Sequence, residues 1–419
     1  MKVLVVGGGG REHAICWKLR QSPRVTELYC APGNAGIAQI ATCVPIKATD
    51  IEGMVRFAKE EQIDLTFVAP DDPLALGMVD AFEAAGLRAF GPNKAAARIE
   101  GSKVFAKELM RKYHIPTAGY AVFEDAEAAI AYLKGQHFPI VVKADGLALG
   151  KGVIIAQDYE EACAAVREMM LDKKFGEAGS RVVIEEFMTG PEVSVLAFTD
   201  GKTVVPMASA QDHKRALDHD QGLNTGGMGT FSPTPKYTKE VADYCQKEIF
   251  QPTVDAMAAE GCPFKGVLFF GLMLTEDGPK TLEYNARFGD PEAQVVLPRM
   301  QGDLLEVIEA ILDGKLDGVT LGWSDQAAVC VVLASGGYPV KYASDKVITG
   351  LENLKNGAIA FHAGTARNEA GQLVTAGGRV LGITCLGDTM DEAIAKAYEA
   401  VEGVHFENMH YRTDIGRKK

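Results

Sequence analysis

The order of apolar runs in residues 1–90 is the feature that most restricts the fold of this chain. Short continuous apolar runs alternate with longer segments whose apolar residues recur at helical spacing. The predicted strands are KVLVVG, VTELYCAP, IDLTFVAP and LRAFGP, and the predicted helices between them are REHAICWKLRQ, IEGMVRFAKEEQ and LALGMVDAFEAAG. Such alternation predicts an α/β unit, a Rossmann-like parallel sheet with helices on both faces.

The rest of the chain has a different order of elements, which predicts an α+β region followed by a small mixed α/β unit. A helix over 102–114 is expected to begin after Ser102 as its N-cap. Other helices are expected near 125–134, 158–171, 238–260 and 302–312, and strands at FPIVVKAD, GVIIAQ, RVVIEEF, VSVLAFTD and KTVVPMAS. Residues 264–287 read as a hairpin, and AVCVVLAS begins the last unit, with strands at 358–363 and 379–386. Thr389 and Glu392 form a capping box for its helix.

Composition restricts the class of protein and its partners. A chain of 419 residues is long enough for two to four domains, and it contains no apolar run of the length that a membrane span requires. The net charge of −13 argues against binding to nucleic acid or to an anionic membrane, so phosphate ligands would need local basic residues. The eight cysteines show no CxxC pair and no metal-ligand spacing, which predicts a reduced, cytoplasmic protein.

The segment 280–292, KTLEYNARFGDPE, is the strongest candidate for chemistry. Residues two apart share one face of a strand, so Glu283, Asn285 and Arg287 are expected to project together. A carboxylate beside an amide oxygen suits Mg²⁺ or Mn²⁺, and the Arg287 guanidinium suits a phosphate or a carboxylate. A solvent-facing polar strand edge is the alternative.

The N-terminal glycine turn, GGGGREH at 7–13, predicts an anion site at the start of a helix. It does not fit the dinucleotide fingerprint, because Glu12 replaces the last glycine and CAPGN at 30–34 offers no acid for a ribose. A smaller phosphorylated ligand held with the help of Arg11 fits better. The alternative is a tight turn between strand and helix with no ligand.

A second glycine-rich loop, ADGLALGKG at 144–152, differs from a Walker A loop, because only three residues separate its glycines and Gly152 follows Lys151. We expect a lid between two strands that closes over nucleotide phosphates with Lys151. Lys143, near the end of the preceding strand, is a second candidate for phosphate binding. A lone lysine there would more often be a solvated charge.

Two further polar segments are weaker candidates. RVVIEEFMTGPE at 181–192 runs from a strand into a connector whose backbone can meet an adenine edge, and a following acid can accept ribose hydroxyls. DHKR at 212–215 and NTGGMG at 224–229 bracket a polar stretch in which Asp212 can hold an ammonium group and the glycines allow close approach to a substrate. Surface charge and an ordinary surface loop are the alternatives.

Together these segments resemble the ATP-grasp carboxylate–amine ligases, and among them most closely the glycinamide ribonucleotide synthetase family. The resemblance runs from GGGGREHA through EGSK, KADGLALGKGV, EEFMTGPEVSV, QDHKRALDHDQGLNTGGMG and LEYNARFGDPEAQ to the terminal YRTDIG. It implies an ADP-forming ligase of purine biosynthesis that joins glycine to 5-phosphoribosylamine through a glycyl phosphate. The expected partners are these two small molecules, with no nucleic acid and no membrane, and the expected assembly is a monomer or homodimer.

The resemblance also implies roles for individual residues. ATP would be held by Lys103, Lys143, Gly146, Gly150, Lys151, Gly152, Glu185, Glu186, Phe187 and Glu192, and the metal ion by Glu283 and Asn285. Substrate contacts would come from Gly8, Gly9, Gly10, Arg11, Glu12, Pro32, Gly33, Asn34, Asp71, Lys214, Thr225, Gly226, Gly227 and Arg287. The catalytic residues would be Arg287, Lys143 and Asp212.

The expected domains are an N-terminal substrate domain over 1–101, an ATP-grasp domain over 102–324 and a C-terminal domain over 325–419. The ATP-grasp domain would have two subdomains, with the lid at about 123–188. One segment departs from the family pattern, since APDDPL at 69–74 stands where G-P-E-x-P-L is usual. Asp71 is a methylene shorter than the expected glutamate, and Asp72 is a candidate to compensate.

Three other functions are alternatives to this one. Another ATP-grasp carboxylate–amine ligase would keep the nucleotide and metal residues but lose NTGGMG and RFGDPE. A nicotinamide oxidoreductase would need the fingerprint that the first turn lacks. A catalytically inactive nucleotide-binding protein would show no metal-dependent ATP turnover.

Overall fold

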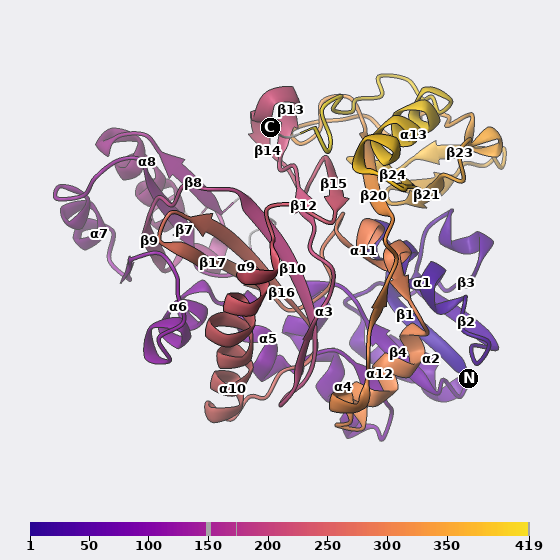
Figure 1. The fold of residues 1–419 in the computed structure, drawn as a ribbon, viewed down its shortest axis with the longest axis horizontal. Coiled ribbons are helices and arrows are strands. Elements are labelled where there is room, and N and C mark those ends of the chain that lie inside the picture. Colours follow the sequence, from indigo (N-terminus) through magenta and orange to yellow (C-terminus); the bar gives the residue numbers. More distant parts are fainter. Residues whose placement is uncertain (148–151, 173, 418–419) are drawn as a thin grey trace.

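The computed structural model describes residues 1–147, 152–172 and 174–417, and its N-terminal part contains the predicted parallel sheet (Figure 1). The strand order is β3-β2-β1-β4-β5, and every pairing is parallel. The strands are β1 (Lys2–Gly7), β2 (Glu27–Pro32), β3 (Thr42–Cys43), β4 (Leu65–Val68) and β5 (Ala89–Phe90). In β1, Val3 and Val5 pack into one core cluster while Leu4 and Val6 pack into another, as expected of a sheet covered on both faces.

The helices of this unit are α1 (Gly10–Leu19), α2 (Ile51–Glu60), α3 (Asp71–Leu76), α4 (Met78–Ala84) and α5 (Lys94–Gly101). The helix predicted from LALGMVDAFEAAG is two helices, and that prediction was wrong in its continuity. Gly77 adopts a φ of +90°, a left-handed conformation that ends α3 and begins α4. Helix α3 begins at Asp71, so the APDDPL segment supplies its first turn.

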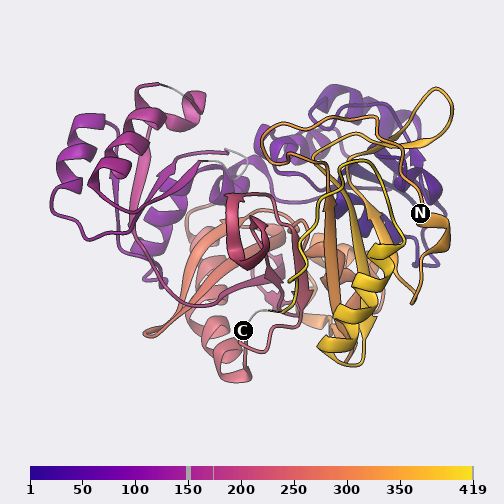
Figure 2. The same ribbon diagram turned by 90° about the horizontal axis from the view of Figure 1, so that it is seen from above.

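A second, antiparallel sheet extends away from the rest of the molecule, on the left in Figure 1, and is seen from above in Figure 2. Its order is β6-β9-β7-β8, with β6 (Tyr120–Phe123), β7 (Ile140–Ala144), β8 (Val153–Ala156) and β9 (Val182–Glu186). Helices α7 (Ala126–Leu133) and α8 (Tyr159–Met170) share a separate core with it. Helix α6 (Lys103–Lys112) leads into this unit, and Ser102 Oγ caps it by accepting from Phe105 N at 3.1 Å, as predicted.

The central sheet has the order β11-β10-β16-β17 and contains the predicted hairpin. Its strands are β10 (Glu192–Asp200), β11 (Val204–Pro206), β16 (Lys265–Thr275) and β17 (Gly278–Asn285). The associated helices are α9 (Lys239–Cys245), α10 (Gln251–Ala259), α11 (Ala293–Arg299) and α12 (Leu304–Leu312), and one π-helical turn, Gln246–Phe250, joins α9 to α10. Residues 239–259 thus form the long helical stretch expected from the sequence.

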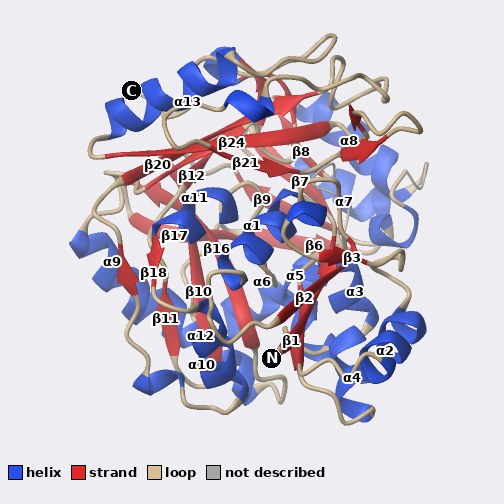
Figure 3. Cartoon of the chain, turned by 90° about the vertical axis from the view of Figure 1, so that its right-hand side faces the viewer, coloured by secondary structure: helices blue, strands red, loops and turns tan. Residues whose placement is uncertain are grey.

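The last sheet combines strands from both sides of residue 325. Its order is β12-β15-β20-β24-β21. The strands are β12 (Gln211–Asp212), β15 (Gly229–Ser232), β20 (Ala327–Ala334), β21 (Ile359–His362) and β24 (Arg379–Gly387). Helix α13 (Met390–Glu402) covers β20 and β24 (Figure 3). Thr389 Oγ1 caps α13 at Glu392 N as predicted, while the Glu392 carboxylate accepts from Asp388 N.

Three two-stranded ribbons complete the strands of the described residues: β13 (Arg215–Leu217) with β14 (Gln221–Asn224), β18 (Met300–Gln301) with β19 (Gly322–Trp323), and β22 (Thr365–Arg367) with β23 (Leu373–Thr375). Short 3₁₀ turns lie at Ile37–Gln39, Gly176–Gly179, Asp218–Asp220, Leu316–Gly318 and Leu351–Asn353. In the described part of the chain, every helix is too short or too polar to cross a bilayer.

Candidate active site

One cavity of about 1510 Å³ lies where the N-terminal unit, the two antiparallel sheets and the C-terminal sheet meet. Most of the residues selected from the sequence line it: Arg11, Asp71, Lys103, Lys143, Gly146, Gly152, Glu185, Glu186, Phe187, Glu192, Asp212, Lys214, Thr225, Gly226, Glu283, Asn285 and Arg287. Gly8, Gly9, Gly10, Glu12, Pro32, Gly33, Asn34 and Gly227 do not line it. Gly150 and Lys151 lie outside the described residues.

The nucleotide candidates converge from α6 and two neighbouring strands. Lys143 in β7 and Glu185 in β9 form an ion pair, with 2.9 Å between Lys143 Nζ and Glu185 Oε2. Lys103, at the start of α6, donates to the backbone oxygen of Gly146 at 2.7 Å. Two ammonium groups therefore lie beside the glycine loop, as a site for a polyphosphate requires.

Sequence analysis missed Lys107, which also reaches this end of the cavity. Its Nζ lies 3.3 Å from Glu185 Oε2, and burial lowers the pKa of Lys107 to about 8. The i,i+4 spacing of Lys103 and Lys107 on one helix face was the available signal. Glu185 Oε1 is buried and has no hydrogen-bond partner among the described residues, so one acceptor in this region is left for a ligand.

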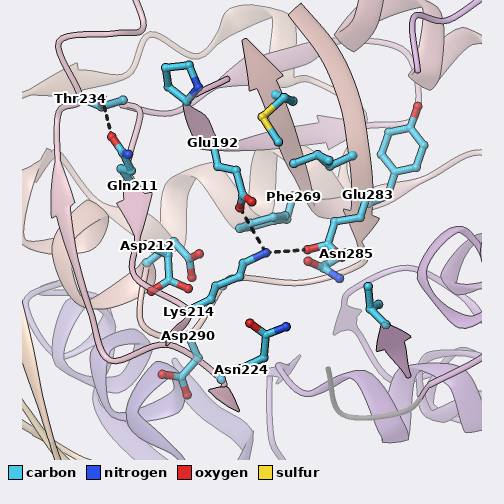
Figure 4. Close-up of a pocket in the computed structure, with 18 of the residues that line it drawn as sticks. Glu192, Gln211, Asp212, Lys214, Asn224, Thr234, Phe269, Glu283, Asn285 and Asp290 are labelled. Atoms are coloured by element: carbon cyan, nitrogen blue, oxygen red, sulfur yellow. Dashed lines mark hydrogen bonds and ion pairs between the residues drawn. The ribbon is translucent and has the colours of Figure 1, made fainter. Parts of the chain in front are cut away.

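Lys214 connects two acids across the middle of the cavity (Figure 4). Its Nζ lies 3.4 Å from Glu283 Oε1 and 3.7 Å from Glu192 Oε2. The charge of Lys214 is the main cause of the lowered pKa of Glu283, which is therefore a carboxylate at neutral pH. The carboxylate predicted to bind a metal ion thus faces the cavity in its charged form.

The donor set at Glu283 and Asn285 fits a hard divalent cation. Both residues lie in β17 and line the cavity. The Asn285 amide nitrogen donates to Glu100 Oε1 at 3.2 Å, so its amide oxygen is the atom that can bind a cation. Within the described ranges, no three His, Cys, Asp or Glu side chains gather to enclose a metal ion. Two protein oxygens are a common share of the ligands of Mg²⁺, which usually takes the others from phosphates and water.

Arg287 lies just past the end of β17, where it is held by Glu100, a second residue that the sequence did not reveal. Arg287 Nη2 lies 2.8 Å from Glu100 Oε1, and Glu100 Oε2 accepts from Ala286 N at 2.7 Å. Burial raises the pKa of Glu100, while the charge of Arg287 opposes this shift. Arg287 Nε is buried without a partner among the described residues, which leaves one donor for a ligand.

Asp212 and Glu292 are two acids that line the cavity and influence each other through their charges. Burial raises the pKa of Asp212 well above its ordinary value, and the charge of Glu292 raises it further. Asp212 Oδ1 accepts from His213 N at 2.7 Å, and Ser194 Oγ donates to Glu292 Oε1 at 3.2 Å. Gly227 packs so closely that a Cβ there would lie 2.7 Å from Asp212 Oδ1, so only glycine fits without displacing this carboxylate.

The N-terminal glycine turn contributes Arg11 to the cavity, and Glu12 stabilises the turn through hydrogen bonds. The Glu12 carboxylate accepts from Gly9 N and from Arg11 Nε, each at 2.7 Å, and its side chain is 2% exposed. Asn34 Nδ2 donates to the backbone oxygens of Gly8 at 2.9 Å and of His362 at 2.8 Å. The turn is therefore joined to β21 of the C-terminal unit.

The departure at residues 69–74 keeps a carboxylate in the cavity. Asp71 lines the cavity from the first turn of α3. Asp72 is exposed and is not among the lining residues, although its backbone N–H donates to Asp71 Oδ1 at 3.0 Å. Asp71 is thus the better candidate for a substrate contact.

Comparisons with known proteins agree with the resemblance found in the motifs. Residues 1–100, 101–293 and 328–418 match the N domain, the ATP-grasp (A) domain and the C domain of phosphoribosylglycinamide synthetase. A relative from Halalkalibacterium halodurans, named phosphoribosylamine–glycine ligase, is 52% identical over 418 residues, 100% of this chain and 97% of the relative. One of the same name from Caldanaerobacter subterraneus subsp. tengcongensis is 51% identical and covers 99% of both chains.

Solved structures agree with the predicted fold. Phosphoribosylamine–glycine ligase from Thermotoga maritima superimposes with a TM-score of 0.84 at 37% identity, over 99% of this chain and 100% of that one. Biotin carboxylase from Campylobacter jejuni, solved as a β-γ-ATP complex, has a TM-score of 0.76 at 14% identity over 98% and 92% of the two chains, a likeness of fold alone. The family and the fold class predicted from the sequence are confirmed, and this chain belongs to the phosphoribosylglycinamide synthetase family.

Proposed function

We propose that this chain joins glycine to 5-phosphoribosylamine at the expense of ATP, giving glycinamide ribonucleotide, ADP and phosphate. The family and the full-length relatives support this reaction. The observation that carries it is that one cavity of the described residues brings together lysines suited to phosphate, the Glu283 and Asn285 oxygens suited to a cation, and the Asp212 and Arg287 side chains. A ligase needs its nucleotide, its acid and its amine in one space.

The chemistry explains why these groups are needed together. A carboxylate is a poor electrophile because oxide is a prohibitive leaving group. Transfer of the γ-phosphate to glycine gives an acyl phosphate and ADP, and attack by the amine of phosphoribosylamine then expels phosphate. The contribution of the protein is to position the reactants and stabilise charge.

We assign the positive charge around the transferred phosphate to Lys103, Lys143 and Arg287. Lys143 is 10% exposed and Arg287 18%, so their charges act in a poorly hydrated space. Asp212 holds the glycine ammonium group beside the Gly226–Gly227 backbone. Glu283 and Asn285 would hold a divalent cation, which would neutralise charge on the ATP phosphates when bound.

The N-terminal turn is assigned to the ribosylamine. Arg11 reaches the cavity and takes the anionic end of this substrate, while Asn34 and Glu12 fix the glycine backbone around it. Asp71 is assigned to the ribosylamine hydroxyls. We further propose Mg²⁺ or Mn²⁺ as the metal ion, a cytoplasmic location, and the division into domains at 101 and 324.

ADP release by the purified chain tests the proposal. The assay contains Mg²⁺, with glycine and freshly generated 5-phosphoribosylamine added singly and together. The expected result is turnover only with both, with ADP and glycinamide ribonucleotide formed in equal amounts. Turnover with a different amine or acid would identify another ATP-grasp ligase, and ATP binding without any turnover would overturn the ligase assignment.

A further inference from the structure

Arg379 reaches from the C-terminal unit into the active-site cavity, and no motif pointed to it. It is the first residue of β24 and its side chain is 21% exposed. Its Nη1 donates to the backbone oxygens of Gly226 at 2.9 Å, Asp290 at 2.8 Å and Gly227 at 3.4 Å. Its Nη2 lies 3.5 Å from Asp290 Oδ2.

These contacts join two segments that are far apart in the sequence. Gly226 and Gly227 belong to the glycine turn that packs against Asp212, and Asp290 belongs to the turn that follows Arg287. The fit is close, because a Cβ at Gly226 would lie 2.9 Å from Arg379 Cζ. Tyr338, also in the C-terminal unit, accepts from Gly226 N at 3.1 Å through its hydroxyl oxygen.

Asp290 extends the connection to the N-terminal unit. Its Oδ2 also accepts from Arg11 N at 3.4 Å, and its Oδ1 accepts from Gln294 Nε2 at 2.7 Å. The charges of Arg379 and Arg11 lower the pKa of Asp290, against the raising effect of burial, which is the largest single influence. One carboxylate therefore receives donors from all three parts of the chain.

We propose that Arg379 is a positioning residue that holds the Gly226–Gly227 turn and the Arg287–Asp290 turn at the separation that both small substrates need. The proposal rests on the proposed ligase function and deepens it. A guanidinium fits this arrangement because it offers two nitrogens: Nη1 meets the three backbone oxygens and Nη2 lies toward Asp290 Oδ2. A lysine ammonium at this position keeps the charge but has a single nitrogen, which cannot meet the three backbone oxygens and Asp290 Oδ2 together.

Steady-state ADP release tests this role in Arg379→Gln, Arg379→Lys and Arg379→Ala, with glycine, 5-phosphoribosylamine and ATP varied in turn. Arg379→Gln and Arg379→Lys should each raise the KM for glycine at least tenfold and leave the KM for ATP within twofold. Added guanidinium should restore part of the activity of Arg379→Ala. Arg367→Gln, an exposed arginine of the same unit, is the matched control and should behave as wild type.

A second variant disturbs the contact between Arg379 and the Gly226–Gly227 turn while keeping the arginine. Gly226→Ala places a methyl group against the guanidinium and should raise the same KM, without the guanidinium rescue. Thermal unfolding with and without ATP is measured for every variant, and ATP should stabilise the Arg379 variants as strongly as the wild type.

The outcomes separate the two proposals. A wild type that is inactive with both substrates would overturn the ligase function and this inference with it. An active wild type beside Arg379→Lys with unchanged KM for glycine would overturn the inference alone. A positive charge without the guanidinium geometry would then be enough for glycine binding. Equal rises in every KM with lost stabilisation by ATP would also overturn it, since they would indicate general damage to the fold.

Discussion

Replacing Glu100 by alanine should inactivate the chain largely through Arg287. Glu100 is the buried acceptor for Arg287 Nη2 at 2.8 Å, for Ala286 N at 2.7 Å and for Asn285 Nδ2 at 3.2 Å. One carboxylate therefore orients both a proposed metal ligand and the proposed phosphate-binding arginine. In Glu100→Ala, Arg287 keeps its charge but loses its only ion-pair partner within the described residues.

The size of the effect follows from the burial of the pair, whose side chains are 18% and 7% exposed. Removing one partner of a buried pair costs about 3–5 kcal/mol. If this cost falls on the positioning of Arg287 in the transition state, kcat/KM for glycine drops roughly 10²- to 4 × 10³-fold, at about 1.4 kcal/mol per factor of ten. Glu100→Gln keeps a neutral acceptor, so a smaller drop of about 5- to 30-fold is expected.

Coupled ADP release with varied glycine measures the change, and circular dichroism checks that each variant is folded. Glu83→Ala removes the same group from an exposed position in α4 and serves as the control. A folded Glu100→Ala variant whose kcat/KM stays within threefold of wild type would refute the reasoning, since Arg287 would then need no anchor.

Three other perturbations have defined outcomes. Glu283→Gln replaces a charged oxygen ligand by an amide, so the Mg²⁺ concentration for half-maximal ADP release should rise at least about tenfold; an unchanged value would place the cation elsewhere. Glu292→Gln removes a charge that raises the pKa of Asp212, so the acid limb of the kcat/KM profile should move to lower pH, and a shift upward would contradict the pairing. Burial lowers the pKa of His13 to about 3, so His13 is neutral when folded and protonates near pH 6.5 when unfolded. The stability it contributes is therefore present above pH 6.5 and declines between pH 6.5 and 3. In urea unfolding His13→Gln should flatten this slope by up to about 1.4 kcal/mol per pH unit, whereas the exposed control His137→Gln should not.

The parts of the fold that local pattern determines were predicted well from the sequence. Continuous apolar runs gave the parallel sheet, and the Ser102 cap and the 264–287 hairpin follow from short-range rules. Gly77 broke an expected helix because a left-handed glycine ended the first segment, a signal present in the sequence but outweighed by the apolar pattern. Long-range pairing, such as that of β15 with β20, has no local signal.

The difference between local pattern and long-range contact also separates the site residues that were predicted from those that were missed. Glu283 and Asn285 were found because strand periodicity and ligand chemistry coincide in one short segment. Glu100 and Arg379 were given no role because each acts on a partner more than 80 residues away, although Glu100 is the first residue of the EGSK motif. Lys107 lies between these cases, since its spacing from Lys103 placed it on the right helix face.

The sheet that contains β12, β15 and β20 combines strands from both sides of residue 325, and this has a consequence for biosynthesis. One edge of β15 pairs with β12, whereas its other edge pairs only with β20, which begins about 95 residues further along the chain. At 5–20 residues per second the ribosome needs roughly 5–20 s to supply that partner. During that interval the nascent chain carries an open strand edge, the kind of surface that recruits other strands. We therefore expect chaperone dependence to be greatest for chains that stop before residue 334.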